Sequence, residues 1–221
     1  MLDEDAELAQ LAGESQLDAA RQASMAAVVV VAPGMWDARE EADRARPGYG
    51  LLVFEGVLIR RVGYEGRFGA ELLAAGDLLR PWEFDGEELL GFETGWRVLV
   101  PTRLAVLDLP WTERMGRYPR VGPALAGRAL VRSRRLGAMM AISQQPRLDE
   151  RLWMMFWELA DRYGRVHADG VHLDLPLTHE VLSYLVAARR PSVSGALTKL
   201  AEQGRVRRDG RGWVLTGEPP W

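Results

Sequence analysis

The pattern of apolar and polar positions predicts a helical segment followed by a sheet. Residues 1–24 are rich in Ala, Glu, Asp and Gln and carry Leu8, Leu11 and Leu17, which is typical of a weakly amphipathic helix or a partly ordered arm. From about residue 26 to residue 109, short apolar runs alternate with glycine turns, a pattern that predicts a β-sandwich or barrel. The runs are Val28–Val31, Leu51–Phe54, Val57–Ile59 and Arg97–Val100, and the turns include Pro33-Gly34, Glu55-Gly56, Gly76-Asp77 and Glu93-Thr94-Gly95.

Helical patterns return after Pro110. Residues 123–145 lack strand-like runs, contain many helix formers and predict one long helix. Small and apolar residues recur along it at spacings of four and three, which favours close approach of a second helix; packing on the chain's own barrel is the alternative. Another helix is predicted from about Leu148 to Tyr163. The recurring positions of the long helix are Ala126, Leu130, Ser133, Gly137 and Met140.

The last 45 residues carry the most informative pattern. Thr178 can cap a short helix, and after a brief turn a second helix begins with Pro191 in its first turn. Apolar residues at helical spacing predict the buried face of this second helix, and a basic hairpin with an Asp209-Gly210 turn follows. Helix, turn, helix and hairpin make a winged helix-turn-helix, which places its second helix in a DNA major groove. The predicted buried positions are Val193, Leu197 and Leu200.

The distribution of charged residues divides the chain into two halves at about residue 116. Residues 1–116 carry 21 acidic and 11 basic side chains, whereas residues 117–221 carry 10 and 17. A net −10 half joined to a net +7 half favours a polyanion partner for the second half, although a solvated surface has the same composition.

The sequence also excludes several kinds of chemistry. Cysteine is absent, which rules out disulfides, iron–sulfur clusters and thiolate sites and agrees with a cytoplasmic location. The longest apolar run, Met25 to Ala32, is too short to cross a membrane, and the acidic start does not resemble a signal peptide. No catalytic triad, nucleophile elbow or phosphate loop is found, so we expect neither an enzyme nor a cofactor. The only histidines, His167, His172 and His179, lie outside the barrel, so we expect no metal or haem there.

The C-terminal motifs resemble those of the Crp/Fnr-type transcription regulators. The similarity rests on Leu173–Glu180, Arg189–Ser194, Leu197, Leu200 and Gly204, followed by the wing, and the segment Gly66 to Pro81 is similar to the family's effector-binding barrel. The resemblance implies an α+β fold with a β-roll or jelly-roll barrel, a long dimerisation helix and a winged domain. The expected divisions are 1–24 for the N-terminal helical arm, 25–116 for the cyclic-nucleotide-binding-like barrel, 117–145 for the dimerisation helix and 146–221 for the DNA-binding domain.

The resemblance also implies partners. A homodimer would place two recognition helices about one DNA turn apart on a pseudo-palindromic operator. RNA polymerase is a further candidate partner, and no membrane is expected. The barrel implies a small-molecule effector, but the positions where the family holds a cyclic phosphate with arginine carry Thr94, Gly95 and Trp96, so cyclic AMP is not expected. Candidates for the effector pocket are Trp82, Thr94, Trp96, Arg97 and Leu136, with barrel core as the alternative for both tryptophans.

Residues that contact DNA can be carried over from the family position by position. Arg190 matches the arginine that reads guanine, a contact that contributes about 1–3 kcal/mol of discrimination. Pro191 and Gly195 replace two base-reading residues of the family, so the operator should differ. Ser192, Ser194, Thr198 and Lys199 are candidates for phosphate or base contacts, and Arg189, Arg207, Arg208 and Arg211 are candidates for backbone anchoring. Thr178 is a further candidate for DNA binding. For His179, a phosphate contact and a plain surface role are both open.

Two other functions remain open from the sequence. One is a ligand-binding or scaffold module that uses the winged fold for protein contacts, which the residues Pro191 and Gly195 favour. The other is a regulator without effector, in which the barrel serves only dimerisation.

Overall fold

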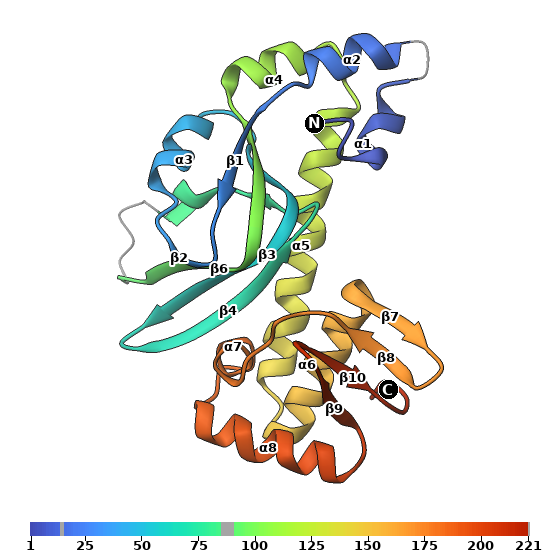
Figure 1. Cartoon of the computed structure of the whole chain (residues 1–221). Helices are drawn as coiled ribbons and strands as arrows, with labels where there is room; N and C mark the ends of the chain where they lie inside the picture. The colour runs from blue at the N-terminus through green and yellow to red at the C-terminus, as the bar shows by residue number, and fades with distance from the viewer. Residues whose placement is uncertain (14–15, 85–90, 221) are drawn as a thin grey trace. The chain divides into compact units, whose positions relative to one another are not determined.

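The protein folds into two compact units. The computed structural model describes residues 1–13, 16–84 and 91–220 (Figure 1). Unit 1 consists of Met1–Arg60 and Leu72–Arg134, and unit 2 consists of Arg61–Glu71 and Arg135–Trp221. Each unit combines helices with a β-sheet, which confirms the predicted α+β class.

The larger sheet has six strands. Its order is β1-β6-β3-β4, with β2 paired to β6 and β5 paired to β3. Strands β1 and β6 run antiparallel, with Val28 opposite Ala105 and Val30 opposite Arg103. The elements of this part of the chain are α1 (Ala6–Leu11), α2 (Leu17–Ala23), β1 (Ala27–Val31), β2 (Gly34–Trp36), α3 (Arg39–Ala45), β3 (Gly50–Tyr64), β4 (Arg67–Ala74), β5 (Leu78–Leu79), the 3₁₀ helix η2 (Pro81–Phe84), β6 (Glu93–Leu107), α4 (Leu109–Met115) and α5 (Val121–Ser143).

The strands are longer than the sequence predicts. Two expected turns, Glu55-Gly56 and Glu93-Thr94-Gly95, lie inside the continuous strands β3 and β6. Gly56 permits this in β3 because it has a φ of +100° and because a Cβ there would collide with Thr102 of β6. Glycine therefore marks a close approach of two strands at this point rather than the end of a strand.

Residues 1–13 and 16–24 contribute apolar side chains to the unit 1 core. They form α1 and α2 rather than one helix, and Leu2 and Leu8 are almost completely buried with Trp111 of α4. The Trp111 indole Nε1 donates to the carbonyl oxygen of Ser24 at 3.1 Å. Asp5 caps α1 and accepts from Arg128 of α5 at 2.6 Å. These contacts differ from the alternative of a partly ordered arm.

Helix α5 has one buried face and one exposed face. Val121, Leu125 and Ile142 are buried. All five positions with four and three spacing are exposed, including Leu130 at 66% and Met140 at 69%. At 100° per residue these exposed positions lie opposite the buried ones. Within unit 1, the seam residues Ala126, Leu130 and Ser133 are therefore not packed on the barrel.

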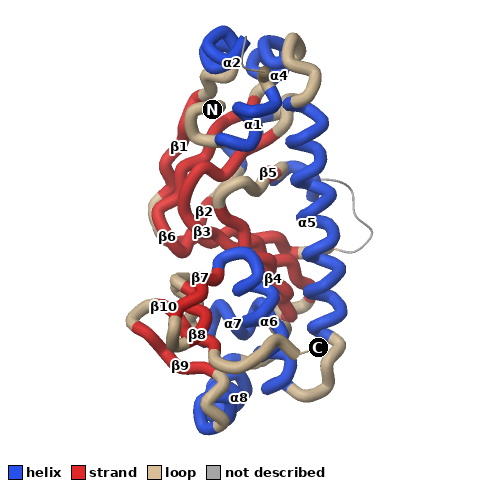
Figure 2. Tube along the Cα trace, turned by 90° about the vertical axis from the view of Figure 1, so that its right-hand side faces the viewer, coloured by secondary structure: helices blue, strands red, loops and turns tan. Residues whose placement is uncertain are grey.

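Unit 2 contains the predicted winged fold and one hairpin that the sequence did not predict. Its four-stranded sheet has the order β7-β8-β10-β9 (strands in red in Figure 2). His167 and His172 belong to the hairpin β7–β8, and their rings lie 4.3 Å apart. Phe156 of α6 packs against Trp213 of β10 with ring centroids 5.2 Å apart. The elements are α6 (Leu148–Tyr163), β7 (Gly164–His167), β8 (Gly170–Leu173), α7 (His179–Leu185), α8 (Arg190–Glu202), β9 (Val206–Asp209) and β10 (Gly212–Leu215).

Candidate DNA-binding site

Local features of the sequence determine where α7 and α8 begin and how the turn between them is formed. The Thr178 hydroxyl accepts from the Val181 amide at 3.2 Å and caps α7, as predicted. In the turn before α8, Ala187 has a φ of +48°, a conformation that L residues rarely adopt and that glycine usually occupies. Because the residue is alanine, the sequence contains no glycine that would predict this turn. Pro191 occupies the first turn of α8, where its missing N–H costs nothing.

The buried face of α8 is the predicted one. Val193, Leu197 and Leu200 are 0–5% exposed and belong to the core of the winged domain. Pro191, Ser192 and Gly195 are exposed on other sides of the helix. Helix α8 therefore presents a polar surface to a partner and an apolar surface to its own domain.

A groove of about 850 Å³ lies between α8 and the wing. Helix α7 supplies its N-terminal residues, α8 supplies polar residues and small apolar ones, and the wing supplies two arginines. The lining residues are Thr178, His179, Glu180, Arg190, Ser194, Leu197, Thr198, Ala201, Val206, Arg207, Arg208 and Trp213. Six of the predicted contact residues thus meet at one groove: Thr178, Arg190, Ser194, Thr198, Arg207 and Arg208.

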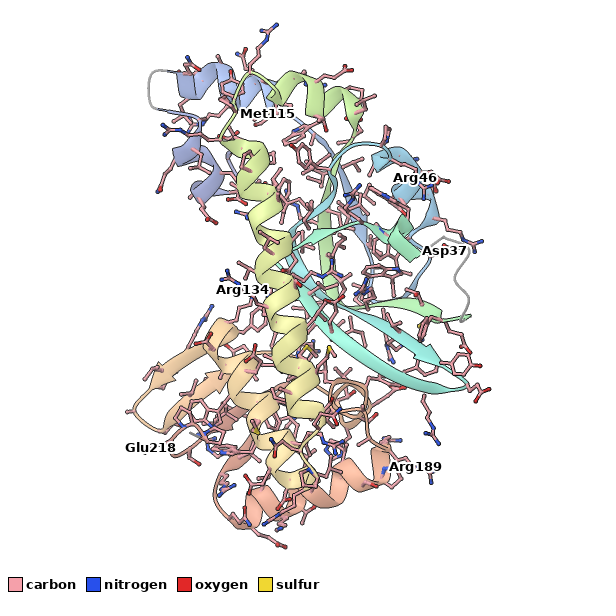
Figure 3. All side chains as sticks on the ribbon, turned by 180° about the vertical axis from the view of Figure 1, so that it is seen from behind. Asp37, Arg46, Met115, Arg134, Arg189 and Glu218 are labelled. Atoms are coloured by element: carbon pink, nitrogen blue, oxygen red, sulfur yellow. The ribbon has the colours of Figure 1, made fainter. Side chains whose placement is uncertain are left out.

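The predicted basic contacts fall into two groups. Within the described residues, the side chains of Arg189, Arg190 and Arg211 have no hydrogen-bond or ion-pair partner, and all three are exposed. Figure 3 labels Arg189 at the start of α8. By contrast, Arg207 pairs with Asp169, and Arg208 donates to the Leu177 carbonyl oxygen at 3.0 Å while its guanidinium lies 4.6 Å from the Trp213 ring centroid. Only the first group is ready to contact phosphate without breaking an existing interaction.

The hydroxyl groups of this face are also partly engaged. Ser194 donates to the Arg190 carbonyl oxygen at 3.2 Å, and Thr198 donates to the Ser194 carbonyl oxygen at 3.1 Å. Such bonds within a helix leave the oxygen free to accept but use the one hydroxyl proton. Ser192 is exposed on the same helix. Contacts of these residues with DNA stay predictions.

Lys199, a candidate for a phosphate or base contact, is exposed but already has a partner within the domain. Its ammonium pairs with Asp149 of α6, whose side chain is 8% exposed. Arg147, which precedes α6, donates to the same carboxylate at 2.9 Å. The partner was not apparent in the sequence because it lies 50 residues away. Lys199 therefore holds α8 on α6, and a phosphate contact would have to compete with this pair.

The Asp149 pair predicts a specific dependence of stability on pH. The hydrogen bonds from Arg147 and Lys199 hold the pKa of Asp149 far below its usual range. A carboxylate with a lowered pKa stabilises the fold above its unfolded pKa of about 4, and this contribution is lost as the pH falls toward the folded pKa. We expect Asp149→Asn to lower the free energy of unfolding by about 1–3 kcal/mol at pH 7.

Denaturant unfolding at a series of pH values measures this effect. The difference between the natural protein and the variant should be largest at neutral pH and should shrink below about pH 4. A difference that stays constant from pH 7 to pH 3 would contradict the assignment. Asp174→Asn is the control, because Asp174 is exposed and its only recorded ion pair within the described residues is a 3.9 Å contact with Arg165.

Unit 1 has a hollow of about 650 Å³ near the candidate effector residues. Thr94 and Trp96 line it together with the exposed Phe92. Trp96 is 7% exposed and packs edge-on against Trp36 at 5.8 Å, so it belongs to the barrel core and also forms a wall of the hollow. Trp96 is therefore a residue of the barrel core, and its contact with an effector stays a prediction.

The other three effector candidates do not line this hollow. Trp82 is half-buried, with the guanidinium groups of Arg46 and Arg80 at 5.6 and 5.2 Å from its ring centroid. Arg97 follows Trp96 in β6, so its side chain leaves the opposite side of the strand. Leu136 lies in α5 within unit 2, whereas the other candidates lie in unit 1.

Two further properties concern the described residues only. Among residues 1–13, 16–84 and 91–220, no group of three or more acidic or histidine side chains is arranged to hold a metal ion. In the same part of the chain, every helix is too short or too polar to cross a lipid bilayer.

Comparison with known proteins finds a family that matches the winged domain and solved structures that share the fold. Residues 150–217 match the Crp-like helix-turn-helix domain. No curated protein matches the chain. Solved structures do: a cyclic nucleotide-binding domain containing protein from Listeria monocytogenes EGD-e has a TM-score of 0.67 at 14% identity, covering 95% of this chain and 96% of that one.

Two other solved structures share the fold. A CooA mutant from Carboxydothermus hydrogenoformans has a TM-score of 0.64 at 15% identity and covers 90% of this chain and 86% of that one. A CRP-family transcriptional regulator from Thermus thermophilus has a TM-score of 0.54 at 21% identity and covers 76% of this chain and 82% of that one. Residues 150–217 therefore belong to the Crp-like helix-turn-helix family, and the chain as a whole has the fold of the Crp/Fnr-type regulators.

Proposed function

We propose that the protein is a homodimeric, sequence-specific DNA-binding transcription regulator of the Crp/Fnr type. The observation that carries this proposal is the exposed, unpaired state of Arg189 and Arg190 at the start of α8, beside the groove of the winged domain. Arginine presents a planar fork of donors that fits both a guanine edge and a phosphate. Arg211 in the wing adds a third unpaired cation. The role is regulatory and not enzymatic, and it is exerted in the cytoplasm with RNA polymerase as a further partner.

The engaged basic residues sharpen the proposal. Arg207 and Lys199 already pair with carboxylates of the same domain, so 2 of the 17 basic side chains of the second half are engaged there and the net charge of +7 is carried by other cations. Among the described residues from 146 onward, the arginines without a hydrogen-bond or ion-pair partner are Arg189 and Arg190 at the start of α8 and Arg211 in the wing. Such a distribution favours a defined DNA contact over nonspecific attraction across the whole surface.

The dimer is proposed from the exposed seam of α5. Ser133 and Gly137 are small residues between Leu130 and Met140, and Ala126 precedes them on the same face, so two copies of the helix could pack closely. Apolar side chains exposed along a helix without a partner in the chain are typical of a surface between subunits.

The domain division and the effector are also part of the proposal. We keep residues 1–24, 25–116, 117–145 and 146–221 as helical arm, sensing barrel, dimerisation helix and DNA-binding domain. The effector is a small molecule other than cyclic AMP, because Thr94, Gly95 and Trp96 supply no cation for a cyclic phosphate.

Selection of bound sequences from a random DNA pool, with and without cyclic AMP, tests the function. We expect enrichment of a two-fold-symmetric site whose recovery does not depend on cyclic AMP. Dependence on cyclic AMP would overturn the proposal for the effector. Absence of enrichment, together with binding that does not weaken as salt rises, would favour the scaffold function, because phosphate contacts release counterions.

Replacing Arg190 tests the reading residue. We expect Arg190→Ala to lower affinity for the selected site by about 1–3 kcal/mol and to relax the preference at one base position in each half-site, because a bidentate guanine contact is lost. Fluorescence anisotropy with the selected duplex and with single-base variants measures both effects. Arg211→Ala is the comparison: it should weaken all sequences alike and reduce the salt dependence. An unchanged base preference in Arg190→Ala would contradict the assignment.

A further inference from the structure

His179 occupies the groove of the winged domain and is tied to α8. Its Nδ1 lies 2.8 Å from the hydroxyl oxygen of Ser194, and the ring centroid lies 6.4 Å from that of Trp213. Within the described residues, Nε2 has no recorded partner. One ring nitrogen is thus fixed by the protein, and the other remains for a ligand.

The hydrogen bonds among His179, Ser194 and the Arg190 carbonyl oxygen determine whether Nε2 of His179 can donate or only accept a hydrogen bond. The Ser194 hydroxyl has one proton and two neighbours, the Arg190 carbonyl oxygen at 3.2 Å and Nδ1 of His179 at 2.8 Å. A carbonyl oxygen can only accept, so both contacts are hydrogen bonds at once only in the tautomer in which Ser194 donates to the carbonyl and Nδ1–H donates to Ser194, and we infer this tautomer. In a neutral imidazole this leaves Nε2 with a lone pair and no hydrogen. A phosphate oxygen is also an acceptor, so Nε2 of neutral His179 cannot form a hydrogen bond with a phosphate.

Protonation changes this. The imidazolium keeps the Nδ1–H bond to Ser194 and gains a charged Nε2–H donor. The charged groups that share the groove are Glu180 from α7, Arg190 from α8, and Arg207 and Arg208 from the wing. Glu180 accepts from the Tyr184 hydroxyl at 3.4 Å, Arg207 pairs with Asp169, and Arg208 donates to a backbone carbonyl. An anion entering the groove meets a mainly cationic lining, and its own charge favours protonated His179.

We propose that His179 binds a DNA phosphate as an imidazolium, so that DNA binding takes up a proton at each winged domain. This inference rests on the proposed function, because it assumes that the groove between α8 and the wing receives DNA. It assigns to His179 a direct contact, and to Ser194 the positioning of the histidine ring in the tautomer that makes proton uptake necessary.

The dependence of DNA affinity on pH tests the proposal in the full-length protein. Anisotropy titrations between pH 6 and pH 8 would use the duplex obtained by selection and a scrambled duplex. Linkage requires affinity to rise as the pH falls, by up to about tenfold per pH unit for each histidine that takes up a proton. The effect should appear with both duplexes, because a phosphate contact does not depend on base sequence.

Two variants separate His179 from the other titrating groups. His179→Gln keeps a hydrogen-bonding side chain without the charge, and it should bind about as weakly at pH 6 as at pH 8. His179→Arg supplies a permanent cation and should bind tightly at both. Any slope that remains in His179→Gln belongs to other groups such as His167 and His172. A slope equal to that of the natural protein would overturn the proposal.

Two measurements on the natural protein do not depend on the folding of a variant. Calorimetry in buffers of different ionisation enthalpy should show net proton uptake on DNA binding, and nitrogen-15 NMR at high pH should show neutral His179 protonated at Nδ1. A neutral ring protonated at Nε2, or binding without proton uptake, would overturn the inference while leaving the proposed function intact. Failure of the protein to bind any duplex at any pH would instead reject the proposed function.

Discussion

A protein with arginine at both Leu130 and Met140 is expected to be monomeric and to lose most of its affinity for a symmetric DNA site. Both side chains are among the most exposed apolar groups of the described residues, and both lie on the seam of α5 opposite its buried face. Arginines on this seam would place like charges at the proposed contact between subunits. A single winged domain then binds without the gain in effective concentration that a linked second domain provides, a loss of about 100- to 10,000-fold.

Sedimentation equilibrium and anisotropy with the selected duplex measure the two effects. Val131→Arg is the matched control, because Val131 is 51% exposed on the same helix and lies away from the seam. The control should remain dimeric and should keep its DNA affinity. A dimeric Leu130→Arg, Met140→Arg protein would show that another surface joins the subunits.

The second large effect is expected in the core of the winged domain. Phe156 is completely buried and packs against Trp213, so the apolar face of α6 and the wing share one cluster. Truncation to Phe156→Ala removes most of this contact and leaves a cavity, which costs about 3–5 kcal/mol. A loss of this size is a large part of the stability of a small domain, so the winged domain should unfold at much lower temperature.

Thermal unfolding followed by tryptophan fluorescence and circular dichroism tests this expectation. Val166→Ala is the control, since Val166 is 86% exposed in β7 and its truncation should change stability by less than about 0.5 kcal/mol. A Phe156→Ala protein as stable as the control would mean that the cluster does not support the domain.

The sequence predicted elements whose pattern is local. The buried face of α8 follows from Val193, Leu197 and Leu200 at helical spacing, and the wing follows from a turn dipeptide between short strands. The hairpin β7–β8 was missed because its strands have only four residues each, begin with glycine and carry no apolar run that predicts a strand. Such a segment becomes strand by pairing with β10, and the pairing is not visible in the segment itself.

The candidate site could be predicted in part for the same reason. The positions of Arg189 and Arg190 follow from where α8 begins, which the sequence shows. The pairing of Arg207 with Asp169 and the contact of His179 with Ser194 join residues 38 and 15 positions apart. Position in an element predicts which side of it a side chain occupies; it does not predict whether another element supplies a partner.

The pair between Lys199 and Asp149 has a practical consequence. Lys199 is the only lysine in the chain, since every other basic side chain among the 28 is an arginine. An amine-directed reagent therefore has one side-chain target, and that target becomes reactive when the ammonium leaves its carboxylate. The rate of labelling at this single position is a chemical reporter of how firmly the recognition helix rests on its own domain, and it can be read in a cell extract as well as in a pure sample.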